Sequence, residues 1–190
     1  MVNSDLKKLA VKKGMKISHN ICYGNLNGYT VTLRDINNGR MIRELYISTV
    51  INQDVKNKIL EALNSANAQK QYKIDFIDVN DSYISIGFVV SMGIMKRLEP
   101  FIDWFMPIVA ASGAQESICP ECGNPMQGDE VKKLLGGHAV CMHSACAQAL
   151  INNVKAEEEE FKNSESNAGK GLLGSVIFGL VSAIPWAVVY

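Results

Sequence analysis

The sequence predicts an α+β protein with a C-terminal membrane helix, and three observations lead to this fold class. Within residues 1–109, apolar and polar residues alternate as in strands, and Asn-Gly turns separate the strand-like segments. Four of the five cysteines fall within residues 119–146, which indicates a small metal-bound module. Residues 171–190 carry no charge, which favours a helix that spans a membrane.

The first predicted part, residues 1–109, is a helix-β-β-β-helix-β-β-helix domain. Tyr29, Val31 and Leu33 share one face of a strand whose other face is polar, as in a half-buried antiparallel strand. Asparagine and glycine accept positive φ, so Asn-Gly dipeptides are expected to form the tight turns. The predicted elements are helix 4–13, strands 16–23, 29–34 and 41–48, helix 53–68, strands 72–79 and 82–89, and helix 92–110.

The last of these helices contains prolines and an excess of apolar residues. Pro100 lacks a backbone N–H, so it is expected to start a new helical segment rather than lie inside a continuous one. The apolar residues are too numerous for one helical stripe, and some are expected to contact a partner or the membrane surface. Complete burial in the core is the alternative. These residues are Phe101, Ile102, Trp104, Phe105, Met106, Ile108 and Val109.

This order of elements resembles the fold of type III secretion chaperones and their relatives. The resemblance is one of topology, and it covers Met1 to about Val109. It implies a dimerising or peptide-binding module without catalysis.

A linker at residues 110–117 is expected to lead into a zinc finger at residues 118–150. Thiolate and imidazole groups suit tetrahedral Zn²⁺, and the segment offers a C-x-x-C pair followed by an H-x-x-C pair. Gly123 helps the first pair to turn, and the second pair has the spacing of two ligands on the first turn of a helix. The preferred ligands are Cys119, Cys122, His143 and Cys146.

Other cysteine and histidine residues leave part of the ligand set open. Cys141 is the main alternative to His143 as the third ligand, and His138 is a further candidate. Cys22 stands apart from the cluster and is expected to be a buried strand residue.

The knuckle, a hairpin turning at Gly136-Gly137 and the ligand-bearing helix together resemble the treble-clef zinc fingers. The ligand spacing is similar to the first half of a LIM-type finger, over about thirty residues. No second finger follows, so LIM-family partners are not implied. Four protein ligands would close the site, which argues for a structural zinc worth roughly 10–16 kcal/mol rather than a catalytic one.

Three other interpretations of the cluster compete with a structural zinc. Cys119 and Cys122 could form a redox dithiol, but the thioredoxin-like βαβ unit that normally carries such a pair is missing. A zinc deaminase needs a proline before the C-x-x-C pair, whereas Pro120 follows its first cysteine. The third interpretation is a set of unconnected buried cysteines.

Nucleic acid is not an expected partner. The chain has no formal net charge, and the finger has only two bases, Lys132 and Lys133. Glu121, Asp129 and Glu130 oppose them, so the basic face that binds phosphates is absent.

The C-terminal part begins with an acidic helical spacer at residues 151–170 and continues as a transmembrane helix at residues 171–190. At about 1.5 Å per residue, a helix of that length matches the hydrocarbon thickness of a bilayer. Trp186 and Tyr190 are aromatic residues typical of the membrane interface. Because the sequence stops inside the apolar run, we expect a tail-anchored protein or a fragment with further spans.

A ridge of small side chains follows one side of this predicted helix. Small residues at every fourth position let membrane helices approach closely, so a homo-oligomer through this ridge is a further expectation. The ridge consists of Gly171, Ser175, Gly179 and Ala183.

These features together predict a membrane-anchored zinc-finger protein that is not an enzyme. Its first domain is expected to be a cytosolic protein-interaction domain of the adaptor or chaperone-like kind, because residues 1–16 lack the apolar core of a secretory signal. Lys162 and Lys170 agree with that orientation at the cell membrane. The alternatives are a zinc-dependent nucleic-acid-binding regulator and a membrane-tethered thiol redox protein. The protein partner is unidentified.

The predicted membrane span yields a first test. After alkaline carbonate washing of membranes, the protein is expected to stay in the pellet, because this treatment strips peripheral proteins but leaves spanning helices inserted. Immunoblotting of both fractions checks this result. Release into the supernatant would contradict a true span.

Overall fold

The computed structural model describes residues 3–18, 20–37, 39–116, 118–126, 128 and 130–163, without the side chains of 161–163. Two units are distinguished, Met1–Gln148 and Ala149–Tyr190, and the division falls within helix α5 (Ser144–Asn163). The sheet, the finger segment and the start of α5 belong to the first unit.

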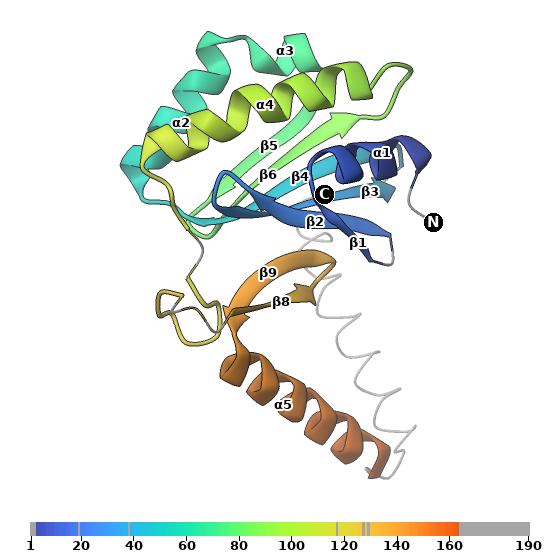
Figure 1. The fold of residues 1–190 in the computed structure, drawn as a ribbon, viewed down its shortest axis with the longest axis vertical. Helices are drawn as coiled ribbons and strands as arrows, with labels where there is room; N and C mark the ends of the chain where they lie inside the picture. Colours follow the sequence, from blue (N-terminus) through green and yellow to red (C-terminus); the bar gives the residue numbers. More distant parts are fainter. Residues whose placement is uncertain are drawn as a thin grey trace, which may run out of the picture. The chain divides into compact units, whose positions relative to one another are not determined.

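An antiparallel sheet is the centre of the first unit (Figure 1). Its strand order is β1-β2-β3-β4-β6-β5, and β7 pairs with the end of β4. The strands of the sheet are β1 (Lys16–Ser18), β2 (Ile21–Leu26), β3 (Tyr29–Asn37), β4 (Met41–Val50), β5 (Ile74–Asn80), β6 (Tyr83–Val89) and β7 (Gln115–Glu116). The helices before α5 are α1 (Ser4–Lys12), α2 (Gln53–Ser65), α3 (Ala68–Tyr72) and α4 (Met95–Ser112). A separate hairpin is formed by β8 (Glu130–Leu135) and β9 (His138–His143).

The two faces of this sheet differ in chemistry. Leu33, Leu45 and Ile86 lie side by side on β3, β4 and β6, and all three are buried in the core. Helices α1, α2 and α4 add their buried leucine, isoleucine and phenylalanine side chains to the same core. Each such side chain contributes about 1.5–3 kcal/mol when fully buried. One residue away along the strands, the register aligns Thr32 with Tyr46 and Ser85, so the opposite face is polar.

The predicted α+β class is confirmed, while several element boundaries differ. The predicted strand 16–23 is two strands, since Ser18 pairs with Ile21 and the chain reverses between them. The predicted helix 53–68 ends at Ser65, and Asn67 takes a left-handed conformation with φ 47° before α3 starts. Neither turn contains glycine or proline, the residues that mark a turn most clearly in sequence.

Helix α4 is continuous through both of its prolines, contrary to the expected break at Pro100. Pro100 and Pro107 lie on its exposed side. Each interior proline costs about 3 kcal/mol, which burial of the opposite side of the helix offsets. Most of the apolar residues in question are buried in the core, while Trp104 and Ile108 are half-buried, so the excess of apolar residues is explained largely by burial. The buried residues of α4 include Leu98, Phe101, Ile102, Phe105, Met106 and Val109.

The segment predicted as a linker, residues 110–117, is held by helix α4 at its start and by the sheet at its last described residues. Its first residues complete α4, and Gly113 then takes φ 91°, which favours glycine. Gln115 and Glu116 pair with the end of β4. The Tyr29 hydroxyl donates to the carbonyl of Ala114 over 2.6 Å. These contacts fix where the finger begins relative to the sheet.

No helix in the described part of the chain is long and apolar enough to cross a membrane. The predicted transmembrane helix at 171–190, its small-residue ridge and residues 164–170 of the predicted spacer lie outside the described residues.

A buried ion pair joins β3 and β4 on the helix-covered face. The Arg43 side chain is 1% exposed, and it donates to both carboxylate oxygens of Asp35, from Nε over 2.7 Å and from Nη2 over 2.9 Å. The two residues are direct partners in the sheet register. Arg43 Nη1 also contacts the sulfur of Met95 at 3.1 Å. This pairing neutralises a charge that the apolar core could not otherwise hold.

We predict that Asp35→Ala lowers the free energy of unfolding by about 3 kcal/mol, because it leaves the Arg43 guanidinium buried without a counter-charge. Urea denaturation of the variant and of the wild type measures the difference in the free energy of unfolding. The matched control is Asp75→Ala, which removes the partner of the exposed Arg40 and should cost less than about 1 kcal/mol. Equal losses in the two variants would contradict the prediction.

Candidate metal centre

A tight knuckle positions the first two cysteines of the cluster. The N–H of Gly123 donates to the carbonyl of Cys119 over 2.8 Å, and the N–H of Cys119 donates to the carbonyl of Asn124 over 3.0 Å. Gly123 has φ 71°, a conformation that side chains disfavour. Cys119 is buried and Cys122 is exposed. The segment from Cys119 to Asn124 thus forms the predicted tight turn.

The second pair of residues comes from the hairpin and the helix that follows it. The predicted turn at Gly136-Gly137 is present, with φ of 58° and 80°, and it joins β8 to β9. His143 is the last residue of β9 rather than a helical residue. Helix α5 starts at Ser144, which places Cys146 in its first turn.

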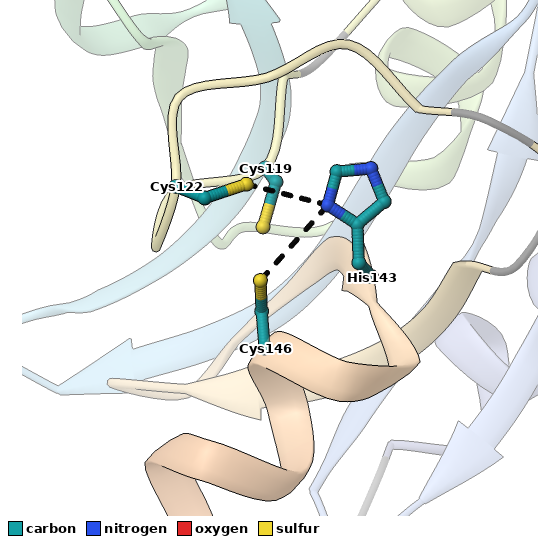
Figure 2. Close-up of side chains that lie close together, drawn as sticks. All are labelled: Cys119, Cys122, His143 and Cys146. Atoms are coloured by element: carbon teal, nitrogen blue, oxygen red, sulfur yellow. Dashed lines mark hydrogen bonds between the residues drawn. The ribbon is translucent and has the colours of Figure 1, made fainter.

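The four preferred ligand residues converge on one point (Figure 2). Their sulfur and nitrogen atoms all lie within 4.8 Å of one another. Nδ1 of His143 is 3.4 Å from the sulfur of Cys122 and 4.0 Å from that of Cys146. A tetrahedral zinc with bonds of about 2.0–2.3 Å separates its ligand atoms by roughly 3.5–3.8 Å. The group is therefore close enough to bind a metal ion.

A backbone contact orients the histidine of this group. Nε2 of His143 lies 3.0 Å from the carbonyl oxygen of Pro125, to which its N–H donates. That hydrogen bond keeps the proton on Nε2 and leaves the lone pair of Nδ1 for a metal. Metal-binding histidines commonly have such a partner on the second nitrogen.

Contacts within the group shift the pKa values of its members in both directions. Burial opposes ionisation of Cys119, but backbone hydrogen bonds from Cys122, His143 and Glu121 outweigh it and lower the pKa of its thiol to about 6. The hydrogen bond with Cys122, together with that to Pro125, raises the pKa of His143 to about 9, so a metal that binds Nδ1 displaces a proton from it.

The fourth member of the group, Cys146, behaves in the opposite way to Cys119. Burial, followed by the hydrogen bonds and charges of Cys122 and Cys119, raises the pKa of its thiol to about 12. Crowded sulfurs thus hold protons that a bound cation would displace.

Cys141 and Cys22 lie outside the group of four. Cys141 is half-exposed on β9, where burial raises the pKa of its thiol. It lines a separate cavity of about 250 Å³ with residues such as Thr30 and Glu116. Cys22 is fully buried on β2, as predicted, and burial raises the pKa of its thiol as well. Its sulfur lies 3.9 Å from the carbonyl of Leu6.

His138, the further candidate ligand, lies at the opposite end of β9 from His143 and contacts the sheet instead. Its Nε2 donates to a carboxylate oxygen of Glu44 over 3.0 Å. Its ring stacks on Tyr46 with centroids 4.0 Å apart. The Ser85 hydroxyl donates to the other oxygen of Glu44 over 2.7 Å, and Arg34 pairs with the same carboxylate. Glu44 is 5% exposed, so a buried carboxylate accepts three hydrogen bonds.

Two further contacts attach the hairpin to this polar face. The N–H of Ala139 donates to the Thr32 hydroxyl over 2.8 Å. Arg34 Nη1 donates to the carbonyl of Gly136 over 3.0 Å. We call Thr32, Arg34, Glu44, Tyr46 and Ser85 the docking face. Sequence patterns missed this role, because no local signal pairs Glu44 with a residue 94 positions later.

The Ser85, Glu44 and His138 contacts do not form a hydrolase triad. In such a triad the histidine lies between the serine and the acid, where it removes the serine's proton. Here the carboxylate lies in the middle, and the serine donates to it. The arrangement orients the hairpin without activating a nucleophile.

Comparison with protein-family models, with curated proteins and with solved structures finds no match. The resemblances to secretion chaperones and to LIM-type fingers therefore rest on element order and ligand spacing alone.

Because Glu44 is ionised in the folded protein, the free energy of unfolding is expected to depend on pH in the acidic range. Burial raises its pKa, but hydrogen bonds from His138, Ser85 and Arg34 together outweigh burial and lower the pKa to about 2. A carboxylate with a depressed pKa stabilises the fold above its unfolded pKa, and this contribution is lost as the pH falls from about 4.5 to about 2.

We predict that Glu44→Gln removes roughly 3 kcal/mol of this acid-sensitive stability. The free energy of unfolding, measured by urea denaturation between pH 5 and pH 2, should fall more steeply in the wild type than in the variant, because Ser85 and Arg34 donate to Glu44 whether or not the hairpin is docked. Glu61→Gln on the exposed side of α2 is the control and should keep the wild-type slope. Identical slopes for wild type and Glu44→Gln would count against the stabilised carboxylate.

Proposed function

We propose that the protein is a membrane-anchored interaction protein of the adaptor or chaperone-like kind, that it is not an enzyme, and that a structural zinc stabilises it. The observation that supports the proposal most strongly is the convergence of Cys119, Cys122, His143 and Cys146 within 4.8 Å. Three sulfurs and one imidazole nitrogen form a ligand set that favours Zn²⁺ over harder cations such as Mg²⁺ and Ca²⁺. Four protein ligands leave no open position for a substrate, so the proposed role is structural.

The interaction role follows from the rest of the chain. The order of elements in residues 1–109 resembles that of secretion chaperones, whose modules dimerise or bind peptides. The proposed anchor is residues 171–190, with the described domains in the cytoplasm. Self-association through the ridge of Gly171, Ser175, Gly179 and Ala183 would bring copies together in the membrane. Crosslinking in membranes, followed by identification of the captured protein, tests this role.

A membrane-tethered thiol redox protein is the second candidate. It is favoured by the exposure of Cys122 and by the lowered pKa of Cys119, because reactive dithiols have one acidic thiol. A dithiol does not need His143 and Cys146 beside it, whereas a metal site does. A nucleic-acid-binding regulator has less support, since Lys132 and Lys133 are the only bases in the finger sequence.

We predict that the full chain, purified in detergent, contains about one zinc per molecule. Cys119→Ser and His143→Ala should lose most of it, because each removes one of four ligands. Cys141→Ser and Cys22→Ser are matched controls that should keep it, since both thiols lie outside the group. Plasma mass spectrometry and competition with a chromophoric chelator measure content and affinity.

A stably folded, zinc-free protein would contradict the zinc proposal. A two-electron oxidation of Cys119 and Cys122 at a moderate potential, in protein that binds no zinc, would favour the redox candidate instead. If Cys141→Ser loses zinc and His143→Ala does not, the third ligand is Cys141 and not His143.

A further inference from the structure

We propose that zinc binding locks the β8–β9 hairpin onto the docking face and that loss of zinc releases the hairpin. This inference rests on the proposed zinc site and adds that zinc regulates access to the docking face. Zinc occupancy would thereby decide whether the polar face of the sheet is covered or accessible.

A single short strand links the metal centre to the docking face. β9 begins at His138, which contacts Glu44 and Tyr46, and ends at His143, which belongs to the metal group. The strand is paired with β8 over its whole length, so it is held extended. A ligand bond at His143 therefore restricts where His138 can lie, and the contact at His138 restricts His143 in turn.

The finger is not part of the main hydrophobic core. Cys119, Ala139, Met142 and Ala147 are buried, yet none of them belongs to the core cluster that the sheet and helices share. Leu134 and Leu135 of the hairpin are exposed. An isolated two-stranded hairpin is marginally stable in water, so this one depends on its metal ligands and on its attachment to the sheet.

The attachment itself is mainly polar and directional. It consists of donors from His138, Ala139 and Arg34, together with the stacking of His138 on Tyr46. Water can replace every one of these hydrogen bonds once the hairpin moves away, whereas an apolar interface would resist separation. The contact therefore suits a reversible latch.

Release would uncover a surface with a defined character. The Glu44 carboxylate would lose one of its three donors, and the Tyr46 ring would lose its stacking on His138 while keeping that on Tyr83. A cavity of about 510 Å³, lined by the knuckle at Cys119 and Pro120 and by Asp81 in the turn between β5 and β6, would open at the same time. The surface would present acidic acceptors beside an aromatic ring, which suits a partner that supplies an arginine or histidine side chain.

Thermodynamic linkage turns the proposal into a measurable effect. If docking and zinc binding stabilise each other and the hairpin is released without zinc, a change that weakens docking weakens zinc binding by up to the same factor. His138 is suited to this test because it lies outside the ligand group and its loss leaves the sheet core intact.

We predict that His138→Ala raises the zinc dissociation constant of the full chain about tenfold, as expected for the loss of one hydrogen bond to a charged group. His138→Gln keeps a donor for Glu44 and should recover part of the affinity. Leu135→Ala is the matched control, because Leu135 pairs with His138 in the hairpin and is exposed. It should leave the affinity unchanged. Equal affinities for His138→Ala and the wild type would overturn the proposal.

Hydrogen exchange on the full chain provides a second readout that does not depend on variants. On zinc removal by a chelator, the Ala139 amide should lose protection, while amides of β3 and β4 that pair within the sheet should keep theirs. An Ala139 amide that stays protected after verified zinc loss would also overturn the latch. A chain that binds no zinc at all would contradict the proposed function as well as the latch. A chain that binds zinc but shows neither effect would contradict the latch alone.

Discussion

The finger depends on one constraint, the convergence of three thiols and one imidazole on a single point. The four groups come from a knuckle, the end of a strand and the first turn of a helix, and the buried residues of the finger do not belong to the main core cluster. Contacts among these groups lower the pKa of Cys119 and raise that of Cys146, so without a cation the thiols compete for protons. A divalent cation resolves that competition by replacing the protons.

The sheet contributes a second, independent kind of stability. Its helix-covered face combines apolar burial with a neutralised arginine, and its other face offers hydroxyls, an arginine and a buried carboxylate to the hairpin. The period of two along β3, β4 and β6 produces both faces from the same strands. The polar face is satisfied by directional hydrogen bonds, which water can replace, and this is why we propose that its cover is reversible. We therefore propose that the finger both covers the polar face of the sheet and links the first domain to the proposed membrane anchor.

The sequence predicted those features that local chemistry determines. Asn-Gly and Gly-Gly turns, the alternation in β3 and the C-x-x-C knuckle all depend on residues close together in the chain. The reversal between Ser18 and Ile21 was missed, because no glycine or proline marks it.

The choice of the third ligand and the contact between Glu44 and His138 depend instead on residues far apart in the chain. The H-x-x-C spacing favoured His143, but by the period of two Cys141 falls on the same side of β9, so the strand pattern left it as an alternative. The position of the knuckle decides which of them lies near it. The pairing of Glu44 with His138 spans 94 positions and follows only from the docked hairpin.

Zinc K-edge X-ray absorption on the full chain tests the central claim most directly, because it reports the atoms bound to the metal rather than its presence. We expect three sulfur neighbours at about 2.3 Å and one nitrogen at about 2.0–2.1 Å, with the multiple-scattering signature of an imidazole ring. Four sulfurs would place Cys141 in the site instead of His143, and oxygen neighbours would indicate an open site. Either result would contradict the closed Cys119, Cys122, His143 and Cys146 centre on which the account rests.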